Sequence, residues 1–214
     1  MELDPTLIVI TDRGILARAS GMPLADAARA AAAGGATIVQ LREKEAPARE
    51  ILWLADEVGA ALEGTGCAFM INDRVDIALA CGAEGVHLGQ EDLPLSRMKA
   101  ISGNRLRFGV SAGKPEWAER ASAEGADYIG VGPIFATRTK GNARPPIGPE
   151  GLARVAAAVP VVPTVAIGGL TDDNLASAIS AGARGVAVIN AVMEASDPEV
   201  ATRNIRLRIE EARA

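Results

Sequence analysis

Short apolar segments alternate with alanine-rich amphipathic stretches eight times along these 214 residues. Parallel strands joined by crossover helices produce this alternation, because strands buried on both faces are apolar throughout and each helix covers the sheet with one face. The pattern predicts an α/β fold with strands near residues 7–11, 37–42, 68–72, 85–88, 107–111, 128–132, 162–167 and 185–189.

The intervening stretches predict helices whose starts coincide with familiar signals. Four of the starts have a proline near the first turn, where the missing N–H costs no hydrogen bond. We expect helices to begin near Pro23, Pro47, Val75, Pro94, Pro115, Glu150 and Asp172, and a last helix from about Asp197.

A short glycine-containing motif recurs before the second, fourth, sixth and eighth strands, at 33–36, 81–84, 124–127 and 181–184. Each copy places glycine where a helix would end in a left-handed turn. Recurrence before even strands only is what a barrel of doubled strand-helix units would leave in a sequence. We therefore predict a single (β/α)8 TIM-barrel domain over residues 1–214, with an open doubly wound sheet as the alternative.

Charge and composition exclude some classes of partner. The net charge is −5 with charges evenly mixed, so no basic face suits nucleic acid or an anionic membrane. Pro160 and Pro163 interrupt the apolar stretch 155–167, and no signal peptide or membrane span is expected. Cys67 and Cys81 lack metal-ligand spacing and are predicted to be buried, reduced, structural thiols. We expect a cytoplasmic protein; no pattern indicates an oligomeric state.

Polar clusters follow several of the predicted strands directly. The carboxyl ends of parallel strands meet at one rim, so residues far apart along the chain would converge there. Strand alternation puts Gln40 and Arg42 on one face, followed by Lys44. The alternative for these residues is a solvated strand end with Arg42 paired to Glu43 or Glu45. The clusters are at 40–44, 72–73, 90–92 and 137–140.

Asp73 and Asp92 end consecutive strands and would be neighbours, with oxygen ligands suited to magnesium. The alternative is that they cap the helices beginning near Val75 and Pro94. If the ligand is a diphosphate, the charge balance favours the metal site over the helix caps. Together with the three cations Arg42, Lys44 and Lys140, the two carboxylates give +1, and a divalent ion raises this to +3 against about −3 on a diphosphate ester.

Three further features bear on function. Gly168 and Gly169 after the seventh strand, with Val188 and Ile189 after the eighth, suit a second phosphate site bound by backbone N–H groups, or simply tight turns. The stretch 135–149 is long for such a loop and is a candidate lid, or a plain surface insertion. His87 lies inside a strand and is predicted to be structural.

Four segments carry a family resemblance: VQLREK at 39–44, INDRVD at 71–76, GVHLGQED at 85–92, and GVGPIFAT at 130–137 running on to Lys140. In this order, and over nearly the whole length, they resemble thiamine phosphate synthase. The resemblance implies a TIM barrel and a transferase of thiamine biosynthesis. A transferase of this family joins two small phosphorylated substrates, 4-amino-2-methyl-5-hydroxymethylpyrimidine diphosphate and thiazole phosphate, and releases pyrophosphate.

The resemblance also implies residue roles and a mechanism. Magnesium and the cations would stabilise the departing pyrophosphate, and the thiazole nitrogen would capture a pyrimidine-methyl cation. The pyrimidine diphosphate would be held by Gln40, Arg42, Lys44, Asn72, Ser111 and Lys140; Mg2+ by Asp73 and Asp92; and the thiazole phosphate by Thr137, Thr139, Gly168, Val188 and Ile189. The chain departs from the family pattern at Gly113 and Asn190.

Two other functions remain open from the sequence. One is an isomerase similar to the thiazole tautomerases, which would need only the second phosphate site. The other is a non-catalytic thiamine phosphate binding protein.

Overall fold

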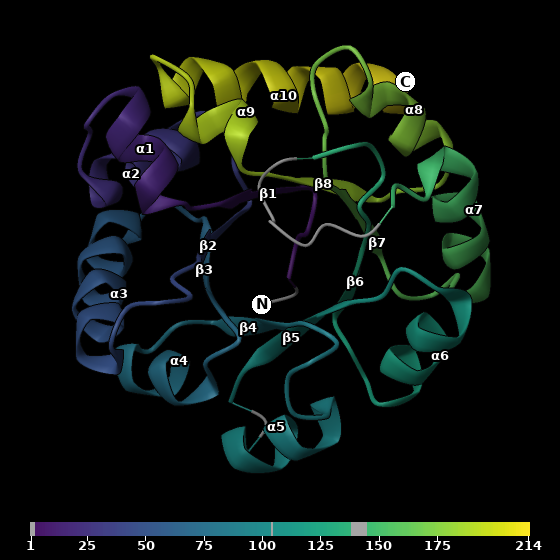
Figure 1. Cartoon of the computed structure of the whole chain (residues 1–214), viewed down its shortest axis with the longest axis horizontal. Helices are drawn as coiled ribbons and strands as arrows, with labels where there is room; N and C mark the ends of the chain where they lie inside the picture. Colours follow the sequence, from purple (N-terminus) through teal and green to yellow (C-terminus); the bar gives the residue numbers. More distant parts are fainter. Residues whose placement is uncertain (1–2, 104, 138–144) are drawn as a thin grey trace.

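The computed structural model describes residues 3–103, 105–137 and 145–214. Eight parallel strands close into a barrel in which each strand pairs with the next along the chain and β8 pairs with β1 (Figure 1). The closed barrel confirms the predicted TIM-barrel fold and excludes the open sheet. The strands are β1 Leu7–Ile10, β2 Ile38–Leu41, β3 Ala68–Asn72, β4 Gly85–Leu88, β5 Arg107–Ser111, β6 Tyr128–Val131, β7 Thr164–Ile167 and β8 Gly185–Val188.

Helices form a ring outside the strands (Figure 1). The predicted starts are confirmed to within a few residues. Within the described part of the chain, no helix combines the length and apolar character needed to cross a membrane. The helices expected from the sequence are α2 Leu24–Ala33, α3 Ala48–Leu62, α4 Val75–Cys81, α5 Leu95–Ser102, α6 Pro115–Ala123, α7 Gly148–Ala158, α8 Leu175–Ser180 and α10 Pro198–Arg213.

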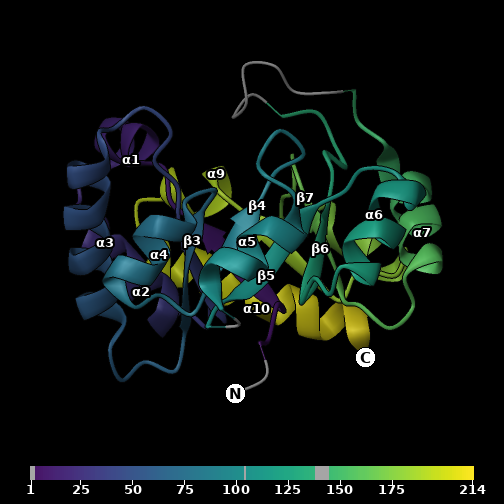
Figure 2. The same ribbon diagram turned by 90° about the horizontal axis from the view of Figure 1, so that it is seen from below.

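Two short helices were not expected, α1 (Arg13–Ala19) and α9 (Asn190–Met193). They follow the carboxyl ends of β1 and β8, and Figure 2 shows both towards the same end of the barrel. α1 begins at a side-chain cap, because Asp12 Oδ1 accepts a hydrogen bond of 2.9 Å from the Ile15 N–H. Each is too short for helical periodicity to stand out in the sequence.

The glycine motif marks the turns that it predicted. Gly35, Gly82, Gly125 and Gly182 have φ angles of 99°, 73°, 81° and 104°, in the left-handed region that favours glycine. These residues return the chain from the end of a helix to the beginning of an even-numbered strand.

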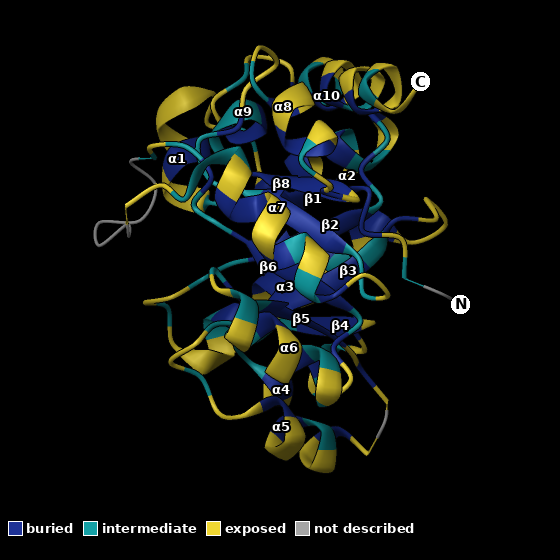
Figure 3. Ribbon diagram, turned by 90° about the vertical axis from the view of Figure 1, so that its right-hand side faces the viewer, coloured by how far each residue is buried: buried dark blue, intermediate teal, exposed yellow. Residues whose placement is uncertain are grey.

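Buried residues are concentrated in the strands and on the inner faces of the helices (Figure 3). Inside the barrel, the fully buried ring of Tyr128 lies against β5 at Gly109. A Cβ atom on Gly109 would be only 2.0 Å from Tyr128 Cζ. The missing side chain of Gly109 therefore makes room for Tyr128.

Both cysteines are free thiols, as expected for structural residues. Cys67 is buried as predicted, whereas Cys81, also predicted to be buried, is only partly buried where it packs against the core. Burial raises the pKa of the Cys67 thiol to about 12, so this group is protonated and unreactive at neutral pH.

Candidate active site

The predicted polar residues of β2 and β3 meet inside the carboxyl end of the barrel. Gln40, only 2% exposed, donates a hydrogen bond of 2.9 Å from Nε2 to Asn72 Oδ1. An amide pair on adjacent strands fixes both side chains, since each limits the rotamers of the other. This bond does not use Asn72 Nδ2 or Gln40 Oε1, so a donor and an acceptor remain for a ligand.

Arg42 follows β2 and is anchored by residues of the first strand-helix unit. Its backbone N–H donates to Thr11 Oγ1 at 3.2 Å, and its Nη1 lies 3.5 Å from Asp12 Oδ2. The alternative pairing with Glu43 or Glu45 is wrong, because the ion pair is made with Asp12 instead. The buried Nε of Arg42 has no hydrogen-bond partner in the described part of the protein, so one donor is available to an anion.

Lys44, Asp73 and Asp92 converge at the ends of β2, β3 and β4. Lys44 Nζ lies 3.4 Å from Asp73 Oδ2, and Asp73 adopts a left-handed backbone with φ of 64°. Burial raises the pKa of the Asp92 carboxyl, and the nearby Asp73 charge raises it further; the Gly89 N–H, 2.6 Å from Asp92 Oδ2, and Lys44 oppose these effects. The two carboxylates are therefore close enough to repel each other.

The capping alternative for these aspartates is wrong. The residue before α4 is Arg74 and the residue before α5 is Pro94, and neither helix has a side-chain cap. Asp92 instead accepts a hydrogen bond from Gly89 within its own loop. Neither carboxylate is used to begin a helix.

The pair can hold a magnesium ion. Mg2+ in proteins is typically bound by one or two carboxylates, with water and substrate phosphates completing the octahedron. No group of three or more His, Cys, Asp or Glu side chains could hold a metal ion among the residues that the structure describes. The fit therefore rests on two carboxylates that repel each other without a cation, and it requires oxygen atoms from a ligand.

His87 connects two other residues of the barrel interior. Its ring nitrogens lie 2.9 Å from Tyr128 Oη and 2.8 Å from Ser111 Oγ, and its ring stacks on Tyr128. Gln90 Nε2 donates to the Ser111 carbonyl, so Ser111 is held from two sides. The supporting role expected of His87 agrees with these contacts. Tyr128 was missed, although it is the single tyrosine of the chain.

The loops after β6 and β7 are packed together. Gly168 and Gly169 have φ of 98° and 65°, and a Cβ atom on Gly168 would lie 2.7 Å from the Pro133 side chain. The Phe135 N–H donates to the Gly168 carbonyl at 3.0 Å. The glycines therefore serve a tight turn and a close approach, and they expose backbone at the rim.

The remaining predicted residues differ in what can be said of them. Val188 ends β8, and Ile189 directly precedes α9. Thr137 is the last described residue before the stretch 138–144; Thr139 and Lys140 lie outside the described residues, as does the middle of the candidate lid. Asn190, one of the two departures from the family pattern, donates a hydrogen bond of 2.5 Å from Nδ2 to Glu194 Oε1, at the end of the same short helix.

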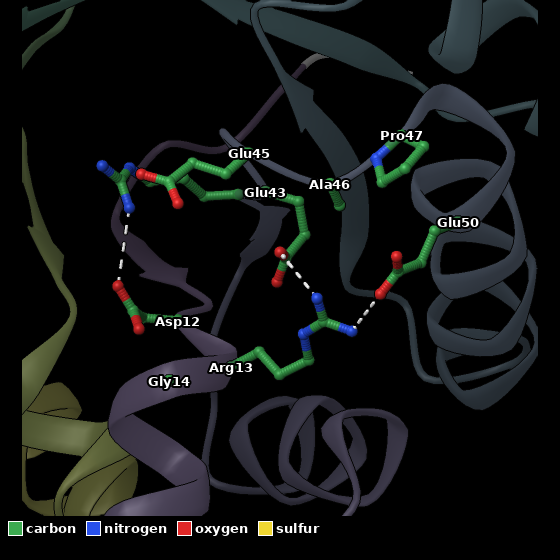
Figure 4. A pocket seen from close by; sticks show the side chains of 9 residues that line it. Asp12, Arg13, Gly14, Glu43, Glu45, Ala46, Pro47 and Glu50 are labelled. Carbon is green, nitrogen blue, oxygen red and sulfur yellow. Dashed lines mark hydrogen bonds and ion pairs between the residues drawn. The ribbon is translucent and has the colours of Figure 1, made fainter.

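A cavity of about 490 Å³ lies beside Arg42, between α1 and α3 (Figure 4). Arg13 stands at its wall between two carboxylates, 2.5 Å from Glu50 Oε1 and 3.5 Å from Glu43 Oε2. Burial raises the pKa of Glu43 while Arg13 opposes this. Asp12 and Arg13 were missed, although Asp12 follows an apolar run just as the predicted clusters do.

Comparisons with known proteins place this arrangement in a family. The family model described as thiamine monophosphate synthase matches residues 7–192. The thiamine-phosphate synthase of Moorella thermoacetica is 49% identical over 193 residues, which are 90% of this chain and 91% of that protein. That of Methanoculleus marisnigri is 45% identical over 208 residues, 97% of each chain.

Solved structures agree. A thiamine phosphate pyrophosphorylase from Pyrococcus furiosus superposes with a TM-score of 0.89 at 39% identity, over 100% of this chain and 99% of that one. A 3-hexulose-6-phosphate synthase at 16% identity, with a TM-score of 0.68 over 95% of this chain and 99% of that one, shares the fold alone. From the family match, the relatives and the barrel together, the chain belongs to the thiamine monophosphate synthase family.

Proposed function

We propose that this enzyme condenses 4-amino-2-methyl-5-hydroxymethylpyrimidine diphosphate with thiazole phosphate, giving thiamine phosphate and pyrophosphate, with Mg2+ as cofactor. Its thiamine-phosphate synthase relatives are transferases of thiamine biosynthesis, and this chain is an enzyme of that class. The observation that carries the finer proposal is the convergence of Lys44, Asp73 and Asp92 at one rim of the barrel.

Electrostatics supports a metal at this point. A carboxylate facing a phosphate oxygen at 4 Å is repelled by about 4 kcal/mol per unit-charge pair at an intermediate dielectric. Asp73 and Asp92 would therefore oppose diphosphate binding unless a cation lay between them and the ligand. A magnesium ion bound there would offset the charge that develops on the departing pyrophosphate.

The proposed roles of the protein groups follow from where their polar atoms lie. Arg42 and Lys44 bind the diphosphate, and the unpartnered Nε of Arg42 supports this. The Gln40–Asn72 pair and Ser111, which His87 supports, orient the pyrimidine. Lys140 completes the diphosphate site by the family resemblance.

The thiazole phosphate is proposed to bind across the barrel, near the ends of β7 and β8. TIM barrels frequently bind phosphate there, at the loops after the last two strands and the start of a short extra helix. Gly168, Val188 and Ile189 supply backbone N–H groups, and α9 is the short helix. Thr137 and Thr139 are assigned to the same phosphate by resemblance.

Catalysis then rests on position and charge rather than on a protein nucleophile. Arg42 and Lys44 stabilise negative charge on the leaving group, and the two anion sites hold the substrates on one rim. Both ring nitrogens of His87 contact neighbouring hydroxyl groups, of Tyr128 and Ser111, so its proposed role is to hold these side chains rather than to transfer a proton. Exclusion of water protects the electron-poor pyrimidine methyl carbon until the thiazole nitrogen reaches it.

The test is pyrophosphate release by purified protein from both substrates, with magnesium and with a chelator. We expect metal-dependent release that falls at least about 100-fold in Asp92→Ala, the scale of losing one electrostatic stabiliser. Asp73→Ala is expected to lose turnover while the fold is retained. Conversion of the thiazole phosphate alone, with no pyrophosphate formed, would instead identify an isomerase. Thiamine phosphate binding without turnover would identify a binding protein.

A further inference from the structure

The unexpected helix α1 places two charged residues against the segment that links β2 to α3. This segment, residues 42–47, begins with Arg42 and carries Lys44. Asp12 contacts its first residue through the ion pair with Arg42, and Arg13 contacts Glu43 beside it. Of the two proposed diphosphate cations in this segment, Arg42 is thus held by the neighbouring strand-helix unit, whereas Lys44 pairs with Asp73.

Asp12 makes two separate contacts with its two carboxylate oxygens. Oδ1 accepts from the Ile15 N–H and begins α1, while Oδ2 faces Arg42 Nη1 at 3.5 Å. The Arg42 side chain is only 15% exposed, so few rotamers are open to it, and the Thr11 hydroxyl holds its backbone N–H. The direction of the Arg42 guanidinium is therefore tied to the start of α1.

Arg13 secures the other side of the same segment. Its guanidinium bridges Glu43 of the segment and Glu50 of α3, as Figure 4 shows. With Asp12 on one side and Arg13 on the other, Arg42 and Glu43 at the start of the segment are held by contacts that need no ligand. Preorganised charges stabilise a transition state without the cost of reorienting them during reaction.

We propose that Asp12 is a positioning residue, which holds the Arg42 guanidinium in the direction needed by the diphosphate leaving group. The inference rests on the proposed function, since it assigns Arg42 to that ligand. A simple counter-charge would act in the opposite direction, because removing a carboxylate next to an anion site strengthens anion binding. The two roles of Asp12 can therefore be separated by the sign of the effect.

The experiment compares Asp12→Asn, Arg42→Ala and the double variant in steady-state pyrophosphate release. Asparagine caps helices about as well as aspartate, so α1 is retained while the charge is removed. We expect kcat to fall about 10-fold and the KM for the pyrimidine diphosphate to rise, with the KM for the thiazole phosphate unchanged. In the Arg42→Ala background, Asp12→Asn should change kcat less than about 2-fold, because it acts through Arg42.

Asp197→Asn is the matched control, since Asp197 caps α10 in the same way through Val200 N–H. It should leave both KM values and kcat unchanged. A lower KM for the diphosphate in Asp12→Asn with unchanged kcat would overturn the proposal in favour of a counter-charge. Equal effects of Asp12→Asn with and without Arg42 would also overturn it, while leaving the proposed function intact.

Failure of the proposed function would appear separately, as absence of pyrophosphate release by the unaltered protein. In that case the same four variants are compared by calorimetric titration with magnesium pyrophosphate. Weaker binding in Asp12→Asn that disappears in the Arg42→Ala background supports the positioning role. Unchanged or tighter binding contradicts it.

Discussion

Lys44 and Asp73 form an ion pair in which Nζ and Oδ2 are 3.4 Å apart, joining the loops after β2 and β3. The lysine side chain is half exposed, so the pair is weak in itself and can rearrange when a ligand binds. Lys44 occupies a position next to the carboxylate where a metal ion would be attracted. Without diphosphate, the positive charge of Lys44 repels a metal ion at Asp73 and weakens its binding. With diphosphate bound, Lys44 and the metal ion both bind the same anion.

Lys44→Met should therefore change metal binding and turnover in opposite directions. Without diphosphate, removal of the competing charge should tighten Mn2+ binding, measured by electron paramagnetic resonance, by roughly 2- to 10-fold. With both substrates, pyrophosphate release should fall by about 100-fold or more, because one leaving-group contact is lost. Lys99→Met is the control, since Lys99 contacts the backbone carbonyls of Glu124 and Gly125. Weaker Mn2+ binding in Lys44→Met would contradict the account.

Asp92→Asn should stabilise the metal-free protein at neutral pH. The pKa of Asp92 is raised in the folded state, mainly by burial. The stability that protonated Asp92 contributes is therefore fully present below the unfolded-state pKa, near 4, and is lost as pH rises through the folded-state pKa. The variant should melt about 1–3 °C higher at pH 7, with the difference vanishing below about pH 4. Magnesium should stabilise the unaltered protein and leave the variant unchanged.

Asp76→Asn provides a control of opposite sign. Hydrogen bonds from Arg74 lower the pKa of Asp76, so its ionised form stabilises the fold above the unfolded pKa and loses this effect as pH falls. This variant should melt at the same temperature or slightly lower at pH 7, since the pair is exposed. A shift of the same sign in both variants would mean that charge reduction in general is responsible.

Gly109→Ala should disrupt the barrel interior. A Cβ atom there would overlap the buried Tyr128 ring, and overpacking of a rigid core costs about 1–3 kcal/mol or more. Urea unfolding should show this loss in the free energy of unfolding. Gly59→Ala is the matched control, because Gly59 lies in α3 and a Cβ atom on it would meet Phe69 of β3 at an ordinary 3.6 Å. That variant should gain up to about 1 kcal/mol. Equal stability of the two variants would contradict the packing described.

The strands and most helices could be predicted from the sequence because buried parallel strands leave apolar runs, and the Gly35, Gly82, Gly125 and Gly182 turns separate them. α1 could not, since its seven residues bury only Ile15 and Leu16. Because α1 was not predicted, its capping residue Asp12 was not recognised as the ion-pair partner of Arg42. A pairing across 30 residues depends on where a short helix begins, which periodicity does not reveal.

The aspartates illustrate the same limit at the site. Spacing alone allowed Asp73 and Asp92 to be helix caps or metal ligands, because both uses follow a strand and precede a helix. The structure excludes the helix caps: Asp73 has a left-handed φ of 64° and contacts Lys44 through its side chain, and the Asp92 carboxylate accepts a hydrogen bond from the Gly89 N–H. The sequence could place both residues at one rim but could not give these local conformations.

The proposed function requires Asp73 and Asp92 to share a metal ion that also binds the diphosphate beside Arg42 and Lys44. Its most direct test is a crystal structure with pyrophosphate and Mn2+ in place of Mg2+, located by anomalous scattering. We expect one manganese peak at coordination distance from both carboxylates, with pyrophosphate oxygens as further ligands. A peak elsewhere, or pyrophosphate bound away from Arg42 and Lys44 with no metal at the two aspartates, would contradict it.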